Sequence, residues 1–366
     1  MYKRQVNIDA SLVSTTATLD RTEERLVEMS NGCICCTLRE DLLIEVARLA
    51  SEGRFDYLLI ESTGISEPMP VAATFLFEDI DGQSLSSLAR LDTMATVVDA
   101  ATFLDRFDHL EELTDLGVGR DDEDDRSVVD LVVDQVEFAN VIAISKPDLV
   151  SPQHLEKVVA MVRRLNPDAR LLLAENGNVP LEDVLDTGLF DEVEGEAAPG
   201  WAQILNDEVT PETEEYGITS FVYRHRWPFH PNRLSRELNE AWPGVLRSKG
   251  FFWLASRPDM QAMWSHAGLS VMLEPLAPWY ASTPEDEWDL ETDEERAELE
   301  ARWDPLLGDR QTEIVFIGID MDEAAIRRRL DACVLTGREF EKGPDKWLKF
   351  RDPLPEWDLS CDLDLE

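Results

Sequence analysis

The stretch ANVIAISKPD, residues 139–148, is a short apolar run that ends in a lysine, a proline and an aspartate. An apolar run of this length, bounded by polar turn residues, is typical of a strand buried on both faces of a parallel sheet. FDYLLIEST (55–63), MATVVDA (94–100) and ARLLLAEN (169–176) have the same form. Together these runs predict a parallel sheet.

Helical patterns lie between these strands. DLLIEVARLASEGR (41–54) is amphipathic and is closed by Gly53, and DRSVVDLVVDQVEFA (125–139) repeats apolar residues at helical spacing. Strands that alternate with helices indicate an α/β domain whose parallel sheet has helices on both faces. In the second half, pieces such as YGITSFVYRHR (216–226) and DEAAIRRRLDACV (322–334) predict a smaller α+β domain.

The composition changes near residue 191, where the chain becomes acidic and rich in proline and glycine. We therefore expect an α/β domain over 1–190, an acidic linker over 191–215, the α+β domain over 216–340 and a tail over 341–366. The acidic stretch 282–304 is expected to be an exposed helix or insert.

The overall composition restricts the class of protein. Of the 366 residues, 43% are hydrophobic, which is typical of a globular protein. No apolar run approaches the roughly 20 residues that span a bilayer, and MYKRQVNIDA (1–10) lacks the apolar core of a secretory signal. We therefore expect a cytoplasmic protein without a membrane partner. The formal net charge of -42 repels phosphate backbones, so nucleic acid is not an expected partner.

The segment NGCICCTLREDLL (31–43) contains Cys33, Cys35 and Cys36, three of the five cysteines. Disulfides are not expected in the cytoplasm, so the cluster indicates a metal site or redox chemistry. A loop can turn three thiolates toward one point, where they suit Zn²⁺ or another soft ion. Three ligands leave a fourth position, as a transferable metal requires. Burial as small apolar side chains is the alternative.

Polar residues follow two of the predicted strands. In LLIESTGISEP (58–68), Glu61 can reach a nucleotide-bound Mg²⁺, and Gly64, next to Thr63, lets a backbone N–H approach a terminal phosphate. For this motif taken alone, an ordinary strand-to-loop transition is the favoured explanation.

The sequence SKPD, from Ser145 to Asp148, resembles the Asn-Lys-x-Asp guanine-recognition loop of GTPases. The Asp148 carboxylate can accept two hydrogen bonds from guanine, and the Lys146 stem can lie over the base. Ser145 stands where Asn is usual. The loop AENGN (174–178), which contains Asn176, falls where another base-contacting segment is expected. A surface loop without ligand is the alternative.

Three segments together resemble the zinc-associated branch of the CobW-type metallochaperone GTPases. They are EMSNGCICCTLREDLL (28–43), the ESTG loop (61–64) and SKPD (145–148). TSFVYRHRWPFHPNRL (219–234) resembles the CobW C-terminal domain. The resemblance implies a P-loop-NTPase-like α/β domain followed by that smaller domain. It also implies the following roles: cargo-metal ligands at Cys33, Cys35 and Cys36, coupling to the γ-phosphate at Glu61 and Gly64, guanine contacts at Lys146 and Asp148, and proximity to the nucleotide metal for Asn7 and Asp9.

The implied function is GTP-dependent delivery of a metal, with zinc favoured over cobalt, to a client metalloprotein. GTP and Mg²⁺ would be the cofactors, and hydrolysis would release the cargo. A cobalt- or iron-centre assembly factor of the same family and a non-catalytic metal-binding adaptor remain alternatives, and a homodimer remains open.

The departure from the family is the Walker A loop, G-x-x-x-x-G-K-[ST], which binds the phosphates and has no match in this sequence. We interpret the sequence as an N-terminally truncated fragment, with a true loss of the loop as the alternative. This chain is expected to bind GTP very weakly and to hydrolyse it negligibly. A micromolar affinity in calorimetry would contradict this expectation.

Two histidines and one further cysteine could have either a binding or a structural role. His225 and His230 could bind a metal or a partner, but a structural role at a strand end is favoured. Cys333 lies on an apolar helical face and is expected in the core.

Overall fold

A computed structural model describes residues 37–53, 55–62, 68, 71–72, 75, 88–109, 127–191, 217–288, 290 and 292–357. The chain divides into two compact units, Met1–Ile60 with Pro70–Ala89, and Glu61–Met69 with Arg90–Glu366. In the first unit, the predicted helix is confirmed as α2 (Thr37–Ser51), which buries Val46 and Leu49.

The strand predicted over 55–63 is wrong for the described residues 55–62, which form neither helix nor strand. Leu59 is 75% exposed, so this apolar run is not buried. A strand is stabilised by hydrogen bonds to a neighbouring strand, and no described strand pairs with this run. Apolar character alone was therefore an insufficient signal here.

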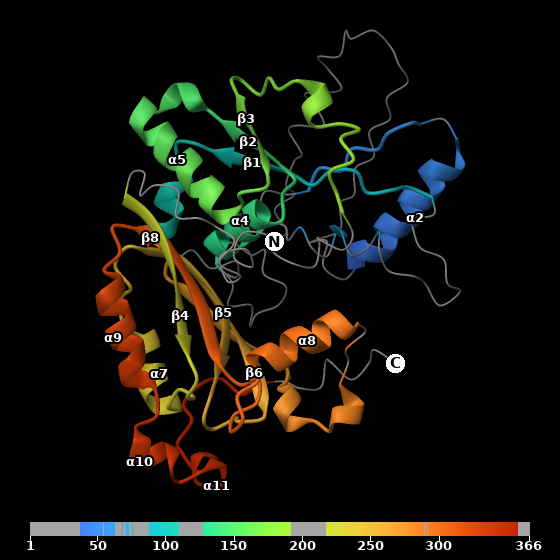
Figure 1. Ribbon diagram of the computed structural model, residues 1–366. Coiled ribbons are helices and arrows are strands. Elements are labelled where there is room, and N and C mark those ends of the chain that lie inside the picture. Colours follow the sequence, from blue (N-terminus) through green and yellow to red (C-terminus); the bar gives the residue numbers. More distant parts are fainter. Residues whose placement is uncertain are drawn as a thin grey trace, which may run out of the picture. The chain divides into compact units, whose positions relative to one another are not determined.

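The second unit contains the predicted parallel sheet, with β1 (Ala95–Asp99), β2 (Val141–Ser145) and β3 (Arg170–Ala174) in the order β1-β2-β3 (Figure 1). These strands confirm the predictions at 94–100, 139–148 and 169–176. Helices α4 (Val128–Glu137) and α5 (Pro152–Leu165) pack on the face of the sheet that bears Val98, Ile142 and Ile144.

Local signals set the ends of these helices. Ser127 caps α4 through a capping box with Asp130, and α5 begins with Pro152 directly after its cap, Ser151. Beyond the end of α5, Asn166 is buried. Its Nδ2 donates to three backbone carbonyls at the end of α4, at 2.8–3.1 Å, and its Oδ1 accepts from the N–H of Ala169 at 3.0 Å. This side chain therefore ties α4 and α5 to the segment that leads into β3.

The α+β prediction for the second half is also confirmed. Its antiparallel sheet has the order β4-β8-β5-β6-β7. The strands are β4 (Ile218–His225), β5 (Val245–Trp253), β6 (Met260–Ala267), β7 (Ser270–Pro278) and β8 (Thr312–Ile319). The hairpin of β6 and β7 was not predicted, because its first strand mixes polar and small residues without clear alternation.

The five-stranded sheet is covered by helices on both faces. Helices α7 (Pro231–Leu238) and α9 (Glu323–Cys333) pack on one face, seen along β4 and β8 in Figure 1, where Leu234 and Leu330 meet Phe316. On the other face, Val315 and Ile317 belong to the same core as α4 and α5. The two sheets of this unit therefore share one hydrophobic core.

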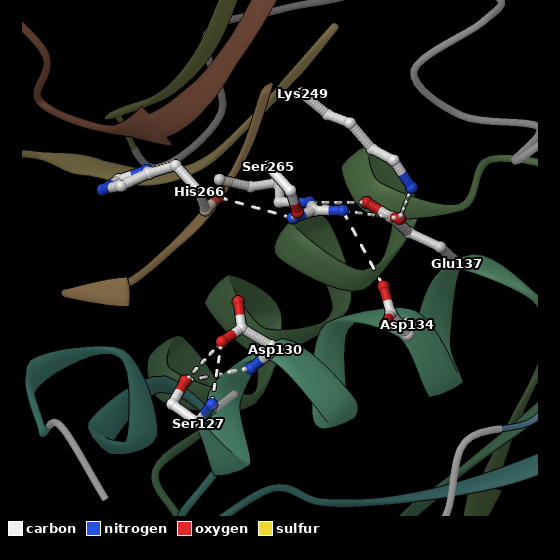
Figure 2. Close-up of polar contacts among 8 residues, drawn as sticks. Ser127, Asp130, Asp134, Glu137, Lys249, Ser265 and His266 are labelled. Carbon is white, nitrogen blue, oxygen red and sulfur yellow. Dashed lines mark hydrogen bonds and ion pairs between the residues drawn. The ribbon is translucent and has the colours of Figure 1, made fainter. Parts of the chain in front are cut away.

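A buried ionic cluster joins α4 to β5 (Figure 2). The Arg247 guanidinium donates to both carboxylate oxygens of Glu137, at 2.9 and 3.0 Å, and both side chains are only 2% exposed. Lys249 approaches the same carboxylate at 3.4 Å, and Asp134 lies 3.8 Å from the guanidinium. Arg247 also donates to the Ser265 hydroxyl at 2.9 Å, so the cluster extends to β6.

The end of the described chain packs against this sheet domain. Helix α8 (Asp293–Arg302) lies in the acidic stretch predicted to be a helix or insert. Beyond α10 (Gly337–Phe340), α11 (Pro344–Trp347) buries Trp347 against Trp253, with ring centroids 6.0 Å apart. Cys333 is buried on α9, which confirms its place in the core. Among the described residues, no helix has the length and apolar character needed to cross a bilayer.

Candidate functional site

The candidate site lies at the carboxyl edge of the parallel sheet. Asp99, Ser145 and Ala174 are register partners at the ends of β1, β2 and β3. The loops that follow these residues therefore start side by side, and in open α/β sheets ligands bind beyond this edge.

The loop after β2 carries the predicted base-recognition residues. Lys146 adopts a left-handed backbone conformation (φ 55°, ψ 38°), which is uncommon for a residue with a side chain. Its carbonyl accepts a hydrogen bond from the N–H of Leu149 at 3.1 Å, which closes the 3₁₀ turn η3 (Pro147–Leu149). Asp148 lies in this turn and is exposed, and its carboxylate has no hydrogen-bonding or ionic partner among the described residues. It is available to accept hydrogen bonds from a ligand.

Lys146 is paired across the edge with a residue that the sequence did not single out. Its Nζ donates to Oδ2 of Asp99, at the end of β1, at 2.6 Å. The other oxygen of Asp99 accepts from the N–H of Ala101 at 2.9 Å. Partial burial alone would raise the pKa of Asp99, but the hydrogen bonds from Lys146 and Ala101 outweigh it and lower that pKa below its ordinary value.

Ser145 has a structural contact of its own. Its hydroxyl donates to the carbonyl of Val98 at 3.2 Å, and its carbonyl accepts from the N–H of Ala100 at 3.0 Å. The serine at the position where Asn is usual therefore binds the neighbouring strand β1 and tightens the sheet edge beneath the loop.

The loop after β3 is a tight turn. Asn178 donates its backbone N–H and its Nδ2 to the carbonyl of Glu175, at 3.0 and 3.1 Å, while Asn176 and Gly177 have positive φ values of 52° and 77°. Asn and Gly are the residues that adopt this conformation most readily. The turn places Asn176, which is exposed, at the same edge as Lys146 and Asp148.

The structure thus brings Ser145, Lys146, Asp148 and Asn176 to one edge of the sheet. Glu61 is exposed and lies in no helix or strand. The other predicted site residues lie outside the described part of the chain: Asn7, Asp9, Cys33, Cys35, Cys36, Thr63 and Gly64. Their roles remain predictions.

Asp99 is the functional candidate that sequence reasoning missed. Its signal was present, since Asp99 is the polar residue near the end of the predicted strand run MATVVDA (94–100) and is the last residue of β1. Its partner is 47 residues away in the sequence, so only the strand pairing reveals the contact.

The two candidate histidines have structural contacts. The His225 ring Nδ1 accepts the N–H of Trp227 at 2.9 Å, and the His230 Nδ1 accepts the N–H of Asn232 at 3.2 Å as the cap of α7. No three His, Cys, Asp or Glu side chains within the described ranges gather as a metal site. These contacts favour the structural interpretation of both histidines.

Two family models match the chain. The model described as "CobW/HypB/UreG, nucleotide-binding domain" matches residues 3–172, and the model described as "Cobalamin synthesis protein cobW C-terminal domain" matches residues 218–334. The first range contains β1 and β2 and ends within β3, and the second range contains the whole antiparallel sheet. The exact limits of domains, linker and tail stay predictions.

Curated relatives cover most of the chain. The zinc-regulated GTPase metalloprotein activator 1 of Dictyostelium discoideum is 44% identical over 96% of this chain and 76% of its own length. The zinc chaperone CobW of Sinorhizobium sp. is 28% identical over 86% of this chain and 82% of its own length. Among solved structures, the Zn(II)-bound YjiA GTPase from E. coli is 20% identical, covers 81% of this chain and 77% of its own, and has a TM-score of 0.33.

Proposed function

Because the chain belongs to the CobW/HypB/UreG family and carries the CobW C-terminal domain, we propose that it is a GTP-dependent zinc chaperone that delivers the metal to a client metalloprotein. Family membership supports nucleotide binding and GTPase activity, which are properties of the family, and the names of its relatives support zinc as the cargo. The single observation that carries the proposed nucleotide site is the Asp148 carboxylate in the loop after β2, which follows Lys146 and has no hydrogen-bonding or ionic partner among the described residues.

Guanine recognition follows from the chemistry of these two side chains. A carboxylate only accepts hydrogen bonds, so Asp148 can pair with the ring N–H and the 2-amino group of guanine, a donor pair that adenine lacks. The aliphatic stem of Lys146 would lie against the face of the base, and Asn176 would contact it from the β3 loop. The residues present therefore fit a guanine base.

The phosphate end of the proposed site involves residues earlier in the chain. Mg²⁺, when bound with GTP, would neutralise charge on the β- and γ-phosphates. We propose that Glu61, Asn7 and Asp9 hold positions near that ion, directly or through water, and that the N–H of Gly64 senses the terminal phosphate. In this scheme, loss of the terminal phosphate changes the conformation of the segment that carries the three clustered cysteines.

The cargo would be held by the thiolates of Cys33, Cys35 and Cys36. Three thiolates provide a strong site for Zn²⁺ and leave one coordination position for a ligand of the client. Zinc binding lowers the pKa of the thiols, so loading would release protons. We propose that GTP binding favours the metal-holding arrangement of this loop and that hydrolysis loosens it. We expect this function in the cytoplasm.

A single substitution tests the proposed recognition of guanine. Asp148→Asn is expected to weaken binding of guanosine monophosphate about 10-fold or more, because a charged acceptor of two hydrogen bonds is replaced by a group that also carries donors. The same variant is expected to gain affinity for xanthosine monophosphate, whose 2-oxo group accepts a hydrogen bond from the new amide. Ligand-observed saturation-transfer NMR measures this binding, even where it is weak.

The matched control is Glu182→Gln, which neutralises another exposed carboxylate in the 3₁₀ turn η4 (Leu181–Asp183). It should leave the preference for guanine unchanged. If Asp148→Asn binds guanosine and xanthosine monophosphate as the parent chain does, Asp148 does not recognise the base.

A further inference from the structure

The contact between Lys146 and Asp99 joins two loops of the candidate site. The Lys146 side chain extends from the loop after β2 across the carboxyl edge of the sheet. Its ammonium group contacts the carboxylate of Asp99 at the end of β1. We infer that Asp99 is a positioning residue for guanine recognition, which holds the Lys146 side chain in the extended arrangement that a purine face can contact. This inference rests on the proposed function.

The Asp99 carboxylate is itself fixed. Oδ1 accepts the N–H of Ala101 at 2.9 Å, and Oδ2 accepts Nζ of Lys146 at 2.6 Å. The backbone of Asp99 is paired in the sheet, and its carbonyl accepts the N–H of Phe103 at 3.0 Å. The oxygen that faces Lys146 therefore has a defined place, set by β1 and by the turn that follows it.

The pair contributes little to stability, which argues against a purely structural role. The Lys146 side chain is 55% exposed and that of Asp99 is 27% exposed, and exposed ion pairs contribute little to the free energy of folding. At the same time, Lys146 adopts a left-handed backbone conformation that is unfavourable for a residue with a side chain. Unfavourable backbone conformations of this kind concentrate at functional sites.

The consequence of the pair is pre-organisation. A free lysine side chain samples many rotamers and loses that freedom when it packs against a ligand. Here the ion pair already restricts the side chain at both ends, so its four methylene groups form a narrow apolar surface beside Asp148 before any base is bound. Asp99 would thus favour guanine binding through Lys146, without touching the base.

The test is a double-mutant cycle on the whole chain. Asp99→Asn keeps the oxygen that accepts from Ala101 and removes the charge that holds Lys146, while Lys146→Met keeps most of the apolar stem and removes the ammonium group. We expect Asp99→Asn to raise the Kd for guanosine monophosphate about 3- to 10-fold, the effect of releasing one flexible side chain. In the Lys146→Met background, the same change should leave the Kd unaltered.

The control is Asp183→Asn, which breaks the exposed pair between Arg170 of β3 and Asp183, 3.3 Å apart. It should leave guanosine monophosphate binding and the melting temperature unchanged. Saturation-transfer NMR with guanosine and adenosine monophosphates gives the affinities, and thermal melting shows that each variant is folded.

The outcomes separate this inference from the proposed function. A parent chain that prefers guanosine over adenosine monophosphate, with an Asp99→Asn variant that binds like the parent, overturns the inference alone. Equal losses from Asp99→Asn in the parent and in Lys146→Met also overturn it, because a merely structural role would act in both backgrounds. A parent chain without any preference for guanine overturns the inference together with the nucleotide half of the proposed function.

Discussion

Replacing Arg247 with methionine is expected to lower the free energy of unfolding by about 3–5 kcal/mol, because it leaves a buried carboxylate without its main partner. Arg247 and Glu137 form a bidentate pair in which both side chains are 2% exposed. After the substitution, Lys249 at 3.4 Å is the cation that still pairs with Glu137 among the described residues. Urea denaturation of both chains gives the difference.

The pair also makes stability depend on pH. Burial alone would raise the pKa of Glu137, but Arg247 and Lys249 outweigh burial and lower it below the ordinary value of about 4.5. Because the folded pKa is depressed, the stabilising contribution is present above the unfolded pKa and is lost as the pH falls through the folded one. The Arg247→Met variant should lack this contribution.

Arg224→Met is the matched control. Arg224 pairs with Glu313 at 2.7 Å within the same sheet, but its side chain is 43% exposed, so the loss should stay within about 1 kcal/mol. A second variant, Arg247→Met with Glu137→Leu, removes both charges and should recover much of the lost stability. Equal losses from Arg247→Met and Arg224→Met would show that the cluster in Figure 2 does not stabilise the junction of α4 and β5.

When the pH falls from 7 to 5, His266 is expected to lower the free energy of unfolding by about 2 kcal/mol. The ring is buried, and burial together with the positive charge of Arg247 lowers the pKa of His266 from 6.5 to about 4. Between these values the unfolded chain binds the proton and the folded chain does not, so stability rises with pH through this window and is lost as the pH falls.

His266→Gln removes the titrating group and should flatten this part of the pH profile, measured by urea denaturation at pH 5 and pH 7. The comparison with the parent chain cancels the contributions of other titrating groups to the pH dependence. One of these is Asp134, whose pKa is raised to about 6 by burial, so that its contribution to stability increases as the pH falls. His109→Gln, at an exposed position, is the control and should leave the profile as it is. A His266→Gln variant with the same profile as the parent would contradict the assignment.

The sequence predicted those parts of the fold that depend on local pattern. Compact apolar runs gave β1, β2 and β3, and helical periodicity gave α2, α4 and α9, because burial imposes these periods directly. The run 55–63 has the same composition but forms no strand over its described residues, since pairing with a neighbour is not encoded in the run itself.

In the candidate site, too, only those features that depend on local sequence were predictable. Lys146, Asp148 and Asn176 were identified because they follow strands, and parallel strands bring their carboxyl ends to one edge. Contacts between residues far apart in the sequence were not identifiable, either at this edge or in the core. Asp99 meets Lys146 across 47 residues, and Arg247 meets Glu137 across 110, so both contacts arise only from packing between distant segments. The clustered cysteines remain a prediction from spacing and resemblance.

Zinc binding to the chain tests the proposed function most directly. In a titration against a chromophoric chelator, we expect the parent chain to bind a single zinc ion, and Cys361→Ser, the control, to bind it equally well. The variant Cys35→Ser with Cys36→Ser should lose this binding, since only one thiolate of the cluster remains. If that variant binds zinc with the stoichiometry and affinity of the parent chain, the metal is held elsewhere and Cys33, Cys35 and Cys36 are not the cargo site.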